Sequence, residues 1–331
     1  MFNKKIGFDF GDNRVKMVAY DGTGIKKAAA LEVLDHMSEE GSILSMNAMA
    51  DFILEGTKEQ GMRGGSASLI LPANSVFTKT VSMPVMSHQQ VLYNLPYEFS
   101  DYLTQEKGLY YFDYMVLGTE TDEEGKPDGM RLFACAVLKS VINDYRSMFR
   151  RAGFRLKTAV PVEYAYAQVL KQYLQDHNLS SDADYCIVDI GHTETRVFIY
   201  HGCEHIQRRN IEFGMRGLDR LIAEQLNVDE HVARTYKESD YNDVLSADYC
   251  VSYYNELAVE IMKTVNFFNY NTRDADLSRI YLAGGGTAIG RIAESIRNMT
   301  GLDTVSASVF FPNEAALENG ELFLAAYGSV M

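Results

Sequence analysis

The sequence predicts an α/β protein with two related halves that face each other across a cleft. Residues 8–22, FDFGDNRVKMVAYDG, and residues 188–202, VDIGHTETRVFIYHG, align without a gap after a shift of 180 positions. Each stretch is typical of a strand, a tight polar turn and a second strand. Near the end of the chain, YLAGGGTAIG is typical of a strand, a glycine loop and a helix. One hairpin built twice, half a chain apart, indicates duplicated domains.

Length and composition agree with a two-domain globular protein. The chain has 331 residues, and 47% of them are hydrophobic while 23% are charged. No apolar run approaches the roughly 18 residues of a membrane span. The N-terminal stretch MFNKKIGFDFG has no signal-peptide core. The four widely spaced cysteines form no CxxC motif, and we interpret them as buried thiols in a reducing compartment: Cys135, Cys186, Cys203 and Cys250.

The charge balance excludes two classes of partner. The formal net charge is −14, from 45 acidic and 31 basic residues. Nucleic-acid binding needs a basic face for phosphate contacts, so the chain is not expected to bind DNA or RNA. Unaided adsorption to anionic lipid is disfavoured for the same reason, and no direct insertion into a membrane is expected.

Strand and helix patterns follow the two halves in order. Residues 4–34 predict three short strands, and residues 48–60 predict a helix. Ser87 and Gln90 predict a capping box for a helix that Pro96 should kink or split. The remaining expected elements are two strands within 66–83, a strand pair at 108–118 and 131–138 across a solvated acidic loop, a helix at 141–151, a strand and helix within 154–174, helices at 218–226 and 257–271, and the final strand, glycine loop and helix within 279–299.

The repeated turn has the chemistry of a phosphate clamp. Glycine in an Asp-x-Gly turn lets successive backbone N–H groups point outward toward phosphate oxygens. An aspartate beside those phosphates can hold Mg²⁺, usually through water. Asp9 and Asp189 are therefore the candidate metal residues. The loop of Gly284, Gly285 and Gly286 would let the backbone approach a flat ligand, although it can also be only a tight turn between a strand and a helix.

These three motifs, in this order, resemble the phosphate-1, phosphate-2 and adenosine motifs of the actin-like ATPase superfamily. Within it, IGFDFGDNRVKMVAY and the stretch LPANSVFTKTVSMPVMS, followed by a helix and FDYMVLG, are similar to PilM-type pilus assembly proteins. The resemblance implies an actin-like, ribonuclease H-like duplicated fold with a small inserted α+β subdomain. The implied divisions are subdomain 1A at 1–77 and 157–181, subdomain 1C at 78–156, subdomain 2A at 182–212 and 275–331, and subdomain 2B at 213–274.

The resemblance also implies ATP and Mg²⁺ as ligands. The family's nucleotide-binding positions correspond to Asp9, Gly11, Asn13, Lys16, Asp189, Gly191, Thr193, Thr195, Gly214, Lys237, Gly284, Gly285, Gly286 and Thr287. Glu163 matches the position that orients water or metal in several relatives, which makes it the candidate catalytic residue. Glutamate is also favoured at a helix start by the helix dipole alone, so that interpretation stays open.

Several positions depart from the family pattern. Asp12 stands where relatives usually carry a small residue or a hydroxyl, and it places a negative charge near the phosphates. His192 and Thr193 replace paired glycines, and Met215 replaces the second glycine of a pair. Arg234 stands where a glutamate often contacts the ribose. The site is therefore expected to bind nucleotide weakly or to be a relic. His192 is open to three interpretations: a surface turn residue, a phosphate donor or a metal ligand.

The expected function is that of a cytoplasmic, ATP-binding component of a type IV pilus or related secretion machine. Because nothing in the sequence anchors to lipid, the resemblance implies recruitment to the inner face of the membrane by the N-terminal cytoplasmic tail of a PilN-like protein. A secretion ATPase and self-association are further partner interpretations. The insertion, about residues 75–156, is the expected receptor for an extended peptide, or it only caps the first domain or mediates self-association.

Two rival functions remain at this stage. An FtsA-like division protein usually carries a C-terminal amphipathic anchor, and LFLAAYGSVM is too short and uncharged for one. A sugar kinase or chaperone-type ATPase would be a true enzyme. No aspartate base for a sugar pocket is evident, and the chain has no room for a peptide-binding domain after the ATPase domain. Slow or absent ATP hydrolysis is expected.

Overall fold

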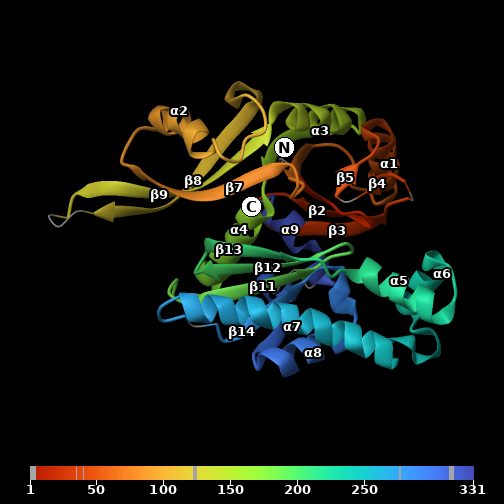
Figure 1. The fold of residues 1–331 in the computed structure, drawn as a ribbon. Helices are drawn as coiled ribbons and strands as arrows, with labels where there is room; N and C mark the ends of the chain where they lie inside the picture. Colours follow the sequence, from red (N-terminus) through yellow and green to blue (C-terminus); the bar gives the residue numbers. More distant parts are fainter. Residues whose placement is uncertain (1–4, 35, 40, 122–124, 276, 313–316) are drawn as a thin grey trace.

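The molecule consists of two lobes, each built on a five-stranded sheet, and an insertion that lies on the first lobe (Figure 1). The structure is a computed structural model, and it describes residues 5–34, 36–39, 41–121, 125–275, 277–312 and 317–331. The two sheets have the strand orders β10-β6-β1-β2-β3 and β15-β14-β11-β12-β13. These orders correspond strand for strand, so the predicted duplication extends well beyond the hairpin.

The first sheet begins with the predicted three-stranded meander. It contains β1 (Lys5–Phe10), β2 (Arg14–Tyr20), β3 (Ile25–Glu32), β6 (Ser66–Ile70) and β10 (Arg155–Val160). The first three strands pair in antiparallel fashion, whereas β6 and β10 run parallel to β1. A small two-stranded ribbon, β4 (Ser38–Glu39) and β5 (Ser42–Ile43), precedes helix α1 (Met46–Glu59). Ser45 caps that helix by accepting a hydrogen bond from the Ala48 N–H.

The second sheet repeats this plan in detail. It contains β11 (Asp184–Ile190), β12 (Thr195–His201), β13 (Glu204–Ile211), β14 (Arg279–Ala283) and β15 (Asp303–Ser306). The β2–β3 ladder shifts register between Ala19 and Tyr20, and the β12–β13 ladder shifts between Ile199 and Tyr200. Even this irregularity therefore recurs after 180 positions. Strand β13 was not among the expected elements, although the same shift applied to β3 would have located it.

Helices of the second lobe include α5 (Met215–Leu226), α6 (Glu230–Ser239), α7 (Asp248–Asn271) and α8 (Gly290–Thr300), with the 3₁₀ segments η2 (Tyr241–Ser246) and η3 (Gly285–Ala288) between them. Helices α7 and α8 lie along the sheet of this lobe, whereas α5 and α6 lie beyond the ends of its strands (Figure 1). Helix α7 begins at Asp248, before the predicted start at Leu257. The prediction missed its first turns because they are rich in tyrosine and show no clear apolar stripe in the sequence. Buried Leu257, Ile261 and Val265 pack with sheet residues such as Val188 and Val197 in one core cluster.

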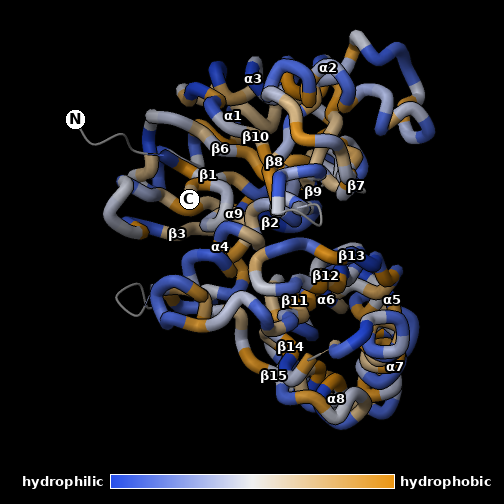
Figure 2. The backbone as a smooth tube through the Cα atoms, turned by 90° about the vertical axis from the view of Figure 1, so that its left-hand side faces the viewer, coloured by the Kyte–Doolittle hydropathy of each residue, from blue (hydrophilic) through white to orange (hydrophobic). Residues whose placement is uncertain are grey.

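Helix α4 (Val162–His177) lies between the two lobes, together with the short helix α9 (Leu324–Gly328). Figure 2 shows the same arrangement from the side, with the first lobe above and the second below. One core cluster joins Val18 and Ile70 of the first sheet to Ile187 and Phe198 of the second through these two helices. Most residues of the stretch LFLAAYGSVM at 322–331 are buried in this cluster. The 3₁₀ segments η4 (Ala307–Phe310) and η5 (Gly320–Phe323) complete this layer.

The insertion is a three-stranded antiparallel sheet with one helix on its face. Strands β7 (Val76–Pro84), β8 (Tyr110–Thr121) and β9 (Pro127–Leu138) pair in the order β7-β9-β8. Helix α2 (His88–Glu98) has the predicted Ser87–Gln90 capping box, Pro96 lies in its last turn, and η1 (Lys107–Leu109) follows it. Residues 122–124 of the predicted acidic loop lie outside the described residues.

Helix α3 (Lys139–Arg151) belongs to the core of the first lobe. Its buried Tyr145, Met148 and Phe149 pack in one cluster with Ile6 and Phe8 of the first sheet. The sequence division had placed this helix inside the 78–156 insertion. We therefore propose that the separately packed part of the insertion ends near Leu138, while the other subdomain boundaries stay as proposals.

Candidate functional site

The first repeated turn joins β1 to β2 at the edge of the cleft. Asp9 lies directly opposite Lys16 in the antiparallel ladder, and the Lys16 Nζ donates to Asp9 Oδ2 over 2.9 Å. The Gly11 N–H closes the turn by donating to the Arg14 carbonyl over 3.0 Å. Lys16 is therefore paired with Asp9, the aspartate that we predicted to lie beside the phosphates.

The second turn has the same backbone and a more enclosed aspartate. The Gly191 N–H donates to the Glu194 carbonyl, again over 3.0 Å. Asp189 pairs with Arg196 in the ladder, and its Oδ2 accepts hydrogen bonds from the Arg196 guanidinium at 2.9 Å and from the buried Tyr166 hydroxyl at 3.2 Å. Burial alone would lower the pKa of Arg196, but the neighbouring Asp189 carboxylate outweighs it and raises that pKa.

The two turns touch each other across the cleft. The Thr193 hydroxyl of the second turn donates to Asp12 Oδ2 of the first over 2.6 Å. The other oxygen of Asp12 accepts from the Gly41 N–H over 2.8 Å. A second contact between the lobes joins the Arg14 guanidinium to Glu238 at 3.7 Å. Residues that are 181 positions apart in the sequence therefore close the space between the turns.

The glycine loop packs against the enclosed aspartate. Gly284 has φ +88° and ψ 174°, a combination that is essentially restricted to glycine. A Cβ at this position would lie 2.5 Å from Asp189 Oδ1 and from the Ile190 carbonyl oxygen. A Cβ on Gly285 would meet only a Leu322 methyl at 3.8 Å. Gly284 thus packs on the second turn, while Gly285 leaves open space for a ligand.

Together these elements line one cleft with a volume of about 1110 Å³. Eleven of the predicted ligand residues line it: Asp9, Gly11, Asn13, Lys16, Asp189, Gly191, Thr193, Lys237, Gly284, Gly285 and Gly286. Its walls carry acidic Asp9, Asp12, Asp189, Glu194, Glu212, Glu238 and Asp240 and basic Arg14, Lys16, Arg196 and Lys237. Acidic groups outnumber basic ones, so an anionic ligand would need a counter-cation to enter.

Three of the predicted residues lie behind the cleft wall instead. The buried Thr195 hydroxyl donates to the Phe213 carbonyl over 2.7 Å, and the Thr287 hydroxyl donates to the Gly284 carbonyl over 2.7 Å. Gly214 precedes α5, and a Cβ there would lie 2.4 Å from the carbonyl carbon of Thr193. These residues fix the shape of the two loops and do not line the cleft.

Glu163 lies outside the cleft as well. Its side chain is 1% exposed, and its Oε1 accepts hydrogen bonds from Arg208 of β13 at 2.7 Å and from Thr78 of β7 at 3.3 Å. Beside it, Arg131 of β9 pairs with Glu204 of β13. In this arrangement Glu163 ties the insertion to the second lobe. Its role as a residue that orients water stays a prediction that this geometry does not favour.

The back of the second turn is filled by helix α5. The Met215 and Arg216 N–H groups, at the start of that helix, donate to the carbonyls of Gly191 and His192 over 3.1 and 2.7 Å. Burial, reinforced by Arg234 and Lys237, lowers the pKa of His192 to about 4. The imidazole is therefore neutral near pH 7 and supplies no positive charge for a phosphate.

Lys237 is held against the cleft wall by a buried carboxylate. Its Nζ lies 2.6 Å from an oxygen of the fully buried Asp219, and Arg234 lies 3.8 Å from the other oxygen. The Arg234 side chain thus takes part in the pairing of Asp219. Sequence reasoning did not find Asp219, because its importance depends on α5 and α6 packing together.

Sequence reasoning also missed the loop after β6. Residues 70–74 line the cleft opposite the glycine loop. Strand β6 runs parallel to β1 as β14 runs parallel to β11, so these residues occupy in the first lobe the place that the glycine loop occupies in the second. The duplication was the signal that could have found them.

Comparison with known proteins identifies the family. The family model described as "Type IV pilus assembly protein PilM" matches residues 7–320. The chain belongs to this family. Among solved structures, the "PilM-PilN type IV pilus biogenesis complex" aligns at a TM-score of 0.83 with 20% identity, over 98% of this chain and 97% of that one. No curated protein sequence was found to match the chain.

More distant solved structures support an actin-like fold. The ethanolamine utilization protein EutJ from Carboxydothermus hydrogenoformans aligns at a TM-score of 0.62 with 13% identity, over 98% of this chain and 88% of that one. MreB5 of Spiroplasma citri bound to AMPPNP aligns at 0.56 with 12% identity, over 100% and 96%. The predicted actin-like duplicated fold is confirmed, and MreB5 of this fold was solved bound to the nucleotides ADP and AMPPNP.

The cleft of this PilM-family chain has a donor set that fits such ligands. Asp9 and Asp189 line the cleft from equivalent turns, and a Cβ on Gly284 would crowd the Oδ1 oxygen of Asp189 at 2.5 Å. Among the described residues, no group of three or more His, Cys, Asp or Glu side chains could hold a metal ion by itself. A Mg²⁺ ion would therefore need the phosphates as ligands, which is how Mg²⁺ is usually bound.

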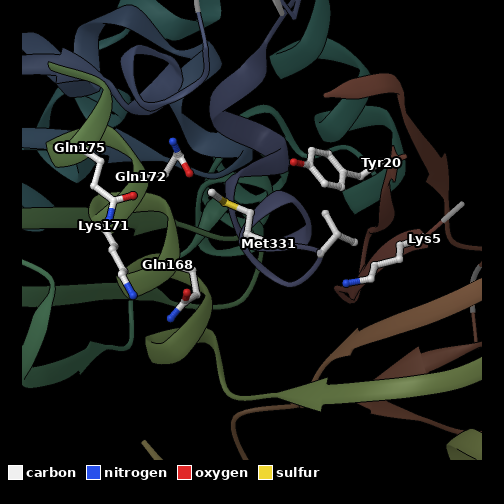
Figure 3. A pocket seen from close by; sticks show the side chains of 8 residues that line it. Lys5, Tyr20, Gln168, Lys171, Gln172, Gln175 and Met331 are labelled. Carbon is white, nitrogen blue, oxygen red and sulfur yellow. The ribbon is translucent and has the colours of Figure 1, made fainter. Parts of the chain in front are cut away.

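A second, smaller cavity lies on another side of the molecule, with a volume of about 390 Å³. Figure 3 shows the glutamines and Lys171 of α4 on one side of it, Lys5 and Tyr20 on the other, and Met331 between them. None of the predicted site residues lines it. In the described part of the chain no helix is long and apolar enough to cross a membrane.

Proposed function

We propose that this protein is the actin-like, ATP-binding component of a type IV pilus or related secretion machine, located at the cytoplasmic face of the inner membrane. The single observation that carries the nucleotide part is the cleft itself. Two equivalent aspartate turns and a glycine loop from three places in the sequence line one cavity. Membership of the PilM family carries the pilus part.

Different residues of the cleft would bind different parts of Mg-ATP. Backbone N–H groups of the two turns would bind the phosphates, and Lys16, whose ammonium donates to Asp9, would contact them as well. Asp9 and Asp189 would hold a Mg²⁺ ion through water. Gly285 and Gly286 would contact the adenosine, together with Lys237, which lines the same cleft. When bound, Mg²⁺ neutralises the phosphates in a cleft whose own charge is acidic.

The test of nucleotide binding is thermal unfolding of the purified chain with and without Mg-ATP. ATP that binds only the native state raises the melting temperature by mass action. Lys16→Met should abolish most of the shift, while Lys5→Met, which removes an equal charge from the same sheet outside the cleft, should keep it. An unchanged melting temperature of the wild-type chain at saturating Mg-ATP would contradict the proposal.

Hydrolysis is proposed to be slow or absent. Phosphoryl transfer depends on a positioned water and on backbone donors that reach the phosphates. Glu163 is buried beneath the insertion and paired with Arg208, and α5 fills the space behind the second turn. Steady release of phosphate at about 1 s⁻¹ or faster would disprove this.

We also propose that a short, extended tail of a PilN-like membrane protein recruits the chain. A solved structure with the same fold is a PilM–PilN complex. The insertion offers an edge strand, since β8 pairs with β9 alone among the described strands, and the exposed apolar side chains on β8 include Tyr111 and Val116. On α2 the exposed rings of Tyr93 and Tyr97 lie 6.4 Å apart. An added peptide strand would gain main-chain hydrogen bonds along β8.

A pull-down of the partner's cytoplasmic tail tests this docking site. Because α3 is part of the first lobe, point variants are better than deletion of the insertion. Val116→Lys and the double variant Tyr93→Ser with Tyr97→Ser should each reduce capture. Tyr270→Ser, which changes an exposed ring on α7, should not. Equal capture by all variants would place the docking site elsewhere and leave self-association or capping as the role of the insertion. Binding of a secretion ATPase is proposed only as a later step of assembly.

A further inference from the structure

Asp12 is the most unusual residue of the cleft. It lies in the first turn between Gly11 and Asn13, and after the 180-position shift it corresponds to His192. Its carboxylate has a hydrogen-bond donor at each oxygen. Oδ2 accepts from the Thr193 hydroxyl of the opposite turn over 2.6 Å, and Oδ1 accepts from the Gly41 N–H over 2.8 Å. Both oxygens thus have donors that come from outside the first turn.

Those two donors are of the kind that a phosphate group accepts from. A hydroxyl and a backbone N–H bind phosphate oxygens as they bind a carboxylate. The Thr193 hydroxyl also spans the two lobes, so the Asp12 carboxylate stands in the narrow space between the two turns. The Asp12 carboxylate therefore occupies the place that the terminal phosphate of a triphosphate would take if the two turns bound its phosphates.

The surrounding charges do not compensate for a second anion at this place. Each of the four cations that line the cleft already faces a carboxylate. The pairs are Lys16 with Asp9, Arg196 with Asp189, Arg14 with Glu32 and Glu238, and Lys237 with Asp219. A phosphate that enters beside Asp12 would be repelled by it and would also have to displace the Thr193 contact.

We propose that Asp12 makes the cleft selective for nucleoside diphosphates over nucleoside triphosphates. The proposal rests on the nucleotide-binding function proposed above and concerns the same site. A diphosphate reaches the glycine loop and the lysine without opening the Asp12–Thr193 contact. A triphosphate binds only by opening it, so its affinity is lower and its binding separates the two turns.

The test is titration calorimetry of Mg-ADP and Mg-ATP with the wild-type chain, Asp12→Asn and Glu238→Gln. Asp12→Asn keeps the shape and removes the charge, and its amide can donate to a phosphate. It should tighten Mg-ATP by at least about fivefold and change Mg-ADP by less than about twofold. Glu238→Gln removes an equal charge from the same cleft, at a residue that contacts Arg14 and not Thr193. It should change the ratio of the two affinities much less than Asp12→Asn does.

The outcomes separate this inference from the function on which it rests. The inference is supported if the wild-type chain binds Mg-ADP more tightly than Mg-ATP and if Asp12→Asn, but not Glu238→Gln, clearly reduces the ratio of these two affinities. If Mg-ATP binds at least as tightly as Mg-ADP and Asp12→Asn leaves the ratio unchanged, the inference is overturned while nucleotide binding stands. Equal changes in the ratio for both variants overturn it as well, because the effect would then be one of total charge. If neither nucleotide binds any of the three proteins, the proposed function fails and this inference fails with it.

Discussion

The two turns that meet in the cleft share a backbone but differ in how their aspartates are held. In the first turn Asp9 has Lys16 as its partner, and both side chains keep some exposure to the cleft, 16% and 18%. In the second turn Asp189 is 10% exposed and is held by Arg196, by the buried Tyr166 hydroxyl and by the packing of Gly284. Duplication preserved the backbone hydrogen bonds of the turns, whereas the side chains that hold the two aspartates diverged.

This difference leads us to expect unequal contributions of the two turns to stability. The second turn is packed from behind by α5 and from the side by the glycine loop. The first turn is contacted by the Gly41 N–H and, across the cleft, by the Thr193 hydroxyl, and its Lys16 and Asp12 line the cleft. Substitutions at equivalent positions should therefore have unequal effects.

The largest contrast is expected between Arg196→Met and Lys16→Met. Removal of Arg196 leaves the Asp189 carboxylate enclosed without its cation, and the free energy of unfolding should fall by about 2–4 kcal/mol. Removal of Lys16 should cost about 1 kcal/mol or less, because Asp9 can still be reached by water. Urea unfolding of both variants measures the difference. Equal losses would show that the two pairs are energetically equivalent.

A smaller contrast is expected between the turn glycines. A Cβ on Gly191 would lie 2.7 Å from the Glu194 carbonyl oxygen, whereas one on Gly11 would lie 3.2 Å from the Arg14 carbonyl oxygen. Gly191→Ala should therefore lower the free energy of unfolding by about 1–3 kcal/mol, and Gly11→Ala by less than about 1 kcal/mol. Thermal unfolding compares them. A more damaging Gly11→Ala would mean that the first turn is the more rigid one.

The pH dependence of the free energy of unfolding should change when His192 of the second turn is replaced. The pKa of His192 is lowered to about 4, below its ordinary value of 6.5, so the unfolded chain binds a proton that the folded chain does not. Stability therefore falls as the pH drops below about 6.5 and continues to fall until about pH 4. Between pH 7 and pH 5 the wild-type chain should lose about 2 kcal/mol more than His192→Gln. Parallel curves for the two proteins would contradict the burial of this imidazole.

The smallest effect is expected from Thr193→Val, which removes the hydrogen bond between the turns. The bond is exposed, so the free energy of unfolding should change by less than about 1 kcal/mol. Chemical unfolding of this variant beside the wild-type chain checks it. A larger loss would show that the contact between the turns contributes strongly to the stability of the native fold.

Local patterns were enough to predict the elements that carry the site. The paired hairpins, the capping box at Ser87 and the glycine loop follow from residue types at short spacing, since strand alternation and turn chemistry act over a few residues. The duplication also predicts strand β13 and the cleft loop after β6. The 180-position shift places β13 where β3 lies in the first half, and the matching sheet orders make the loop after β6 equivalent to the glycine loop after β14.

The tertiary structure decided which of the predicted residues face the cleft and what else holds them. Thr195, Thr287 and Glu163 match sequence motifs, but their side chains bond other protein groups. The buried Thr195 and Glu163 bond Phe213 and Arg208, and the half-buried Thr287 bonds the Gly284 carbonyl of its own loop. The partners that give the site its character are far apart in the chain, as in Asp12 with Thr193. The sequence by itself determined the fold, the duplicated turns and the family, since these depend on local periodicity and motif order. Which carboxylate pairs with which donor depends on how two lobes and an insertion pack, and no local pattern contains that.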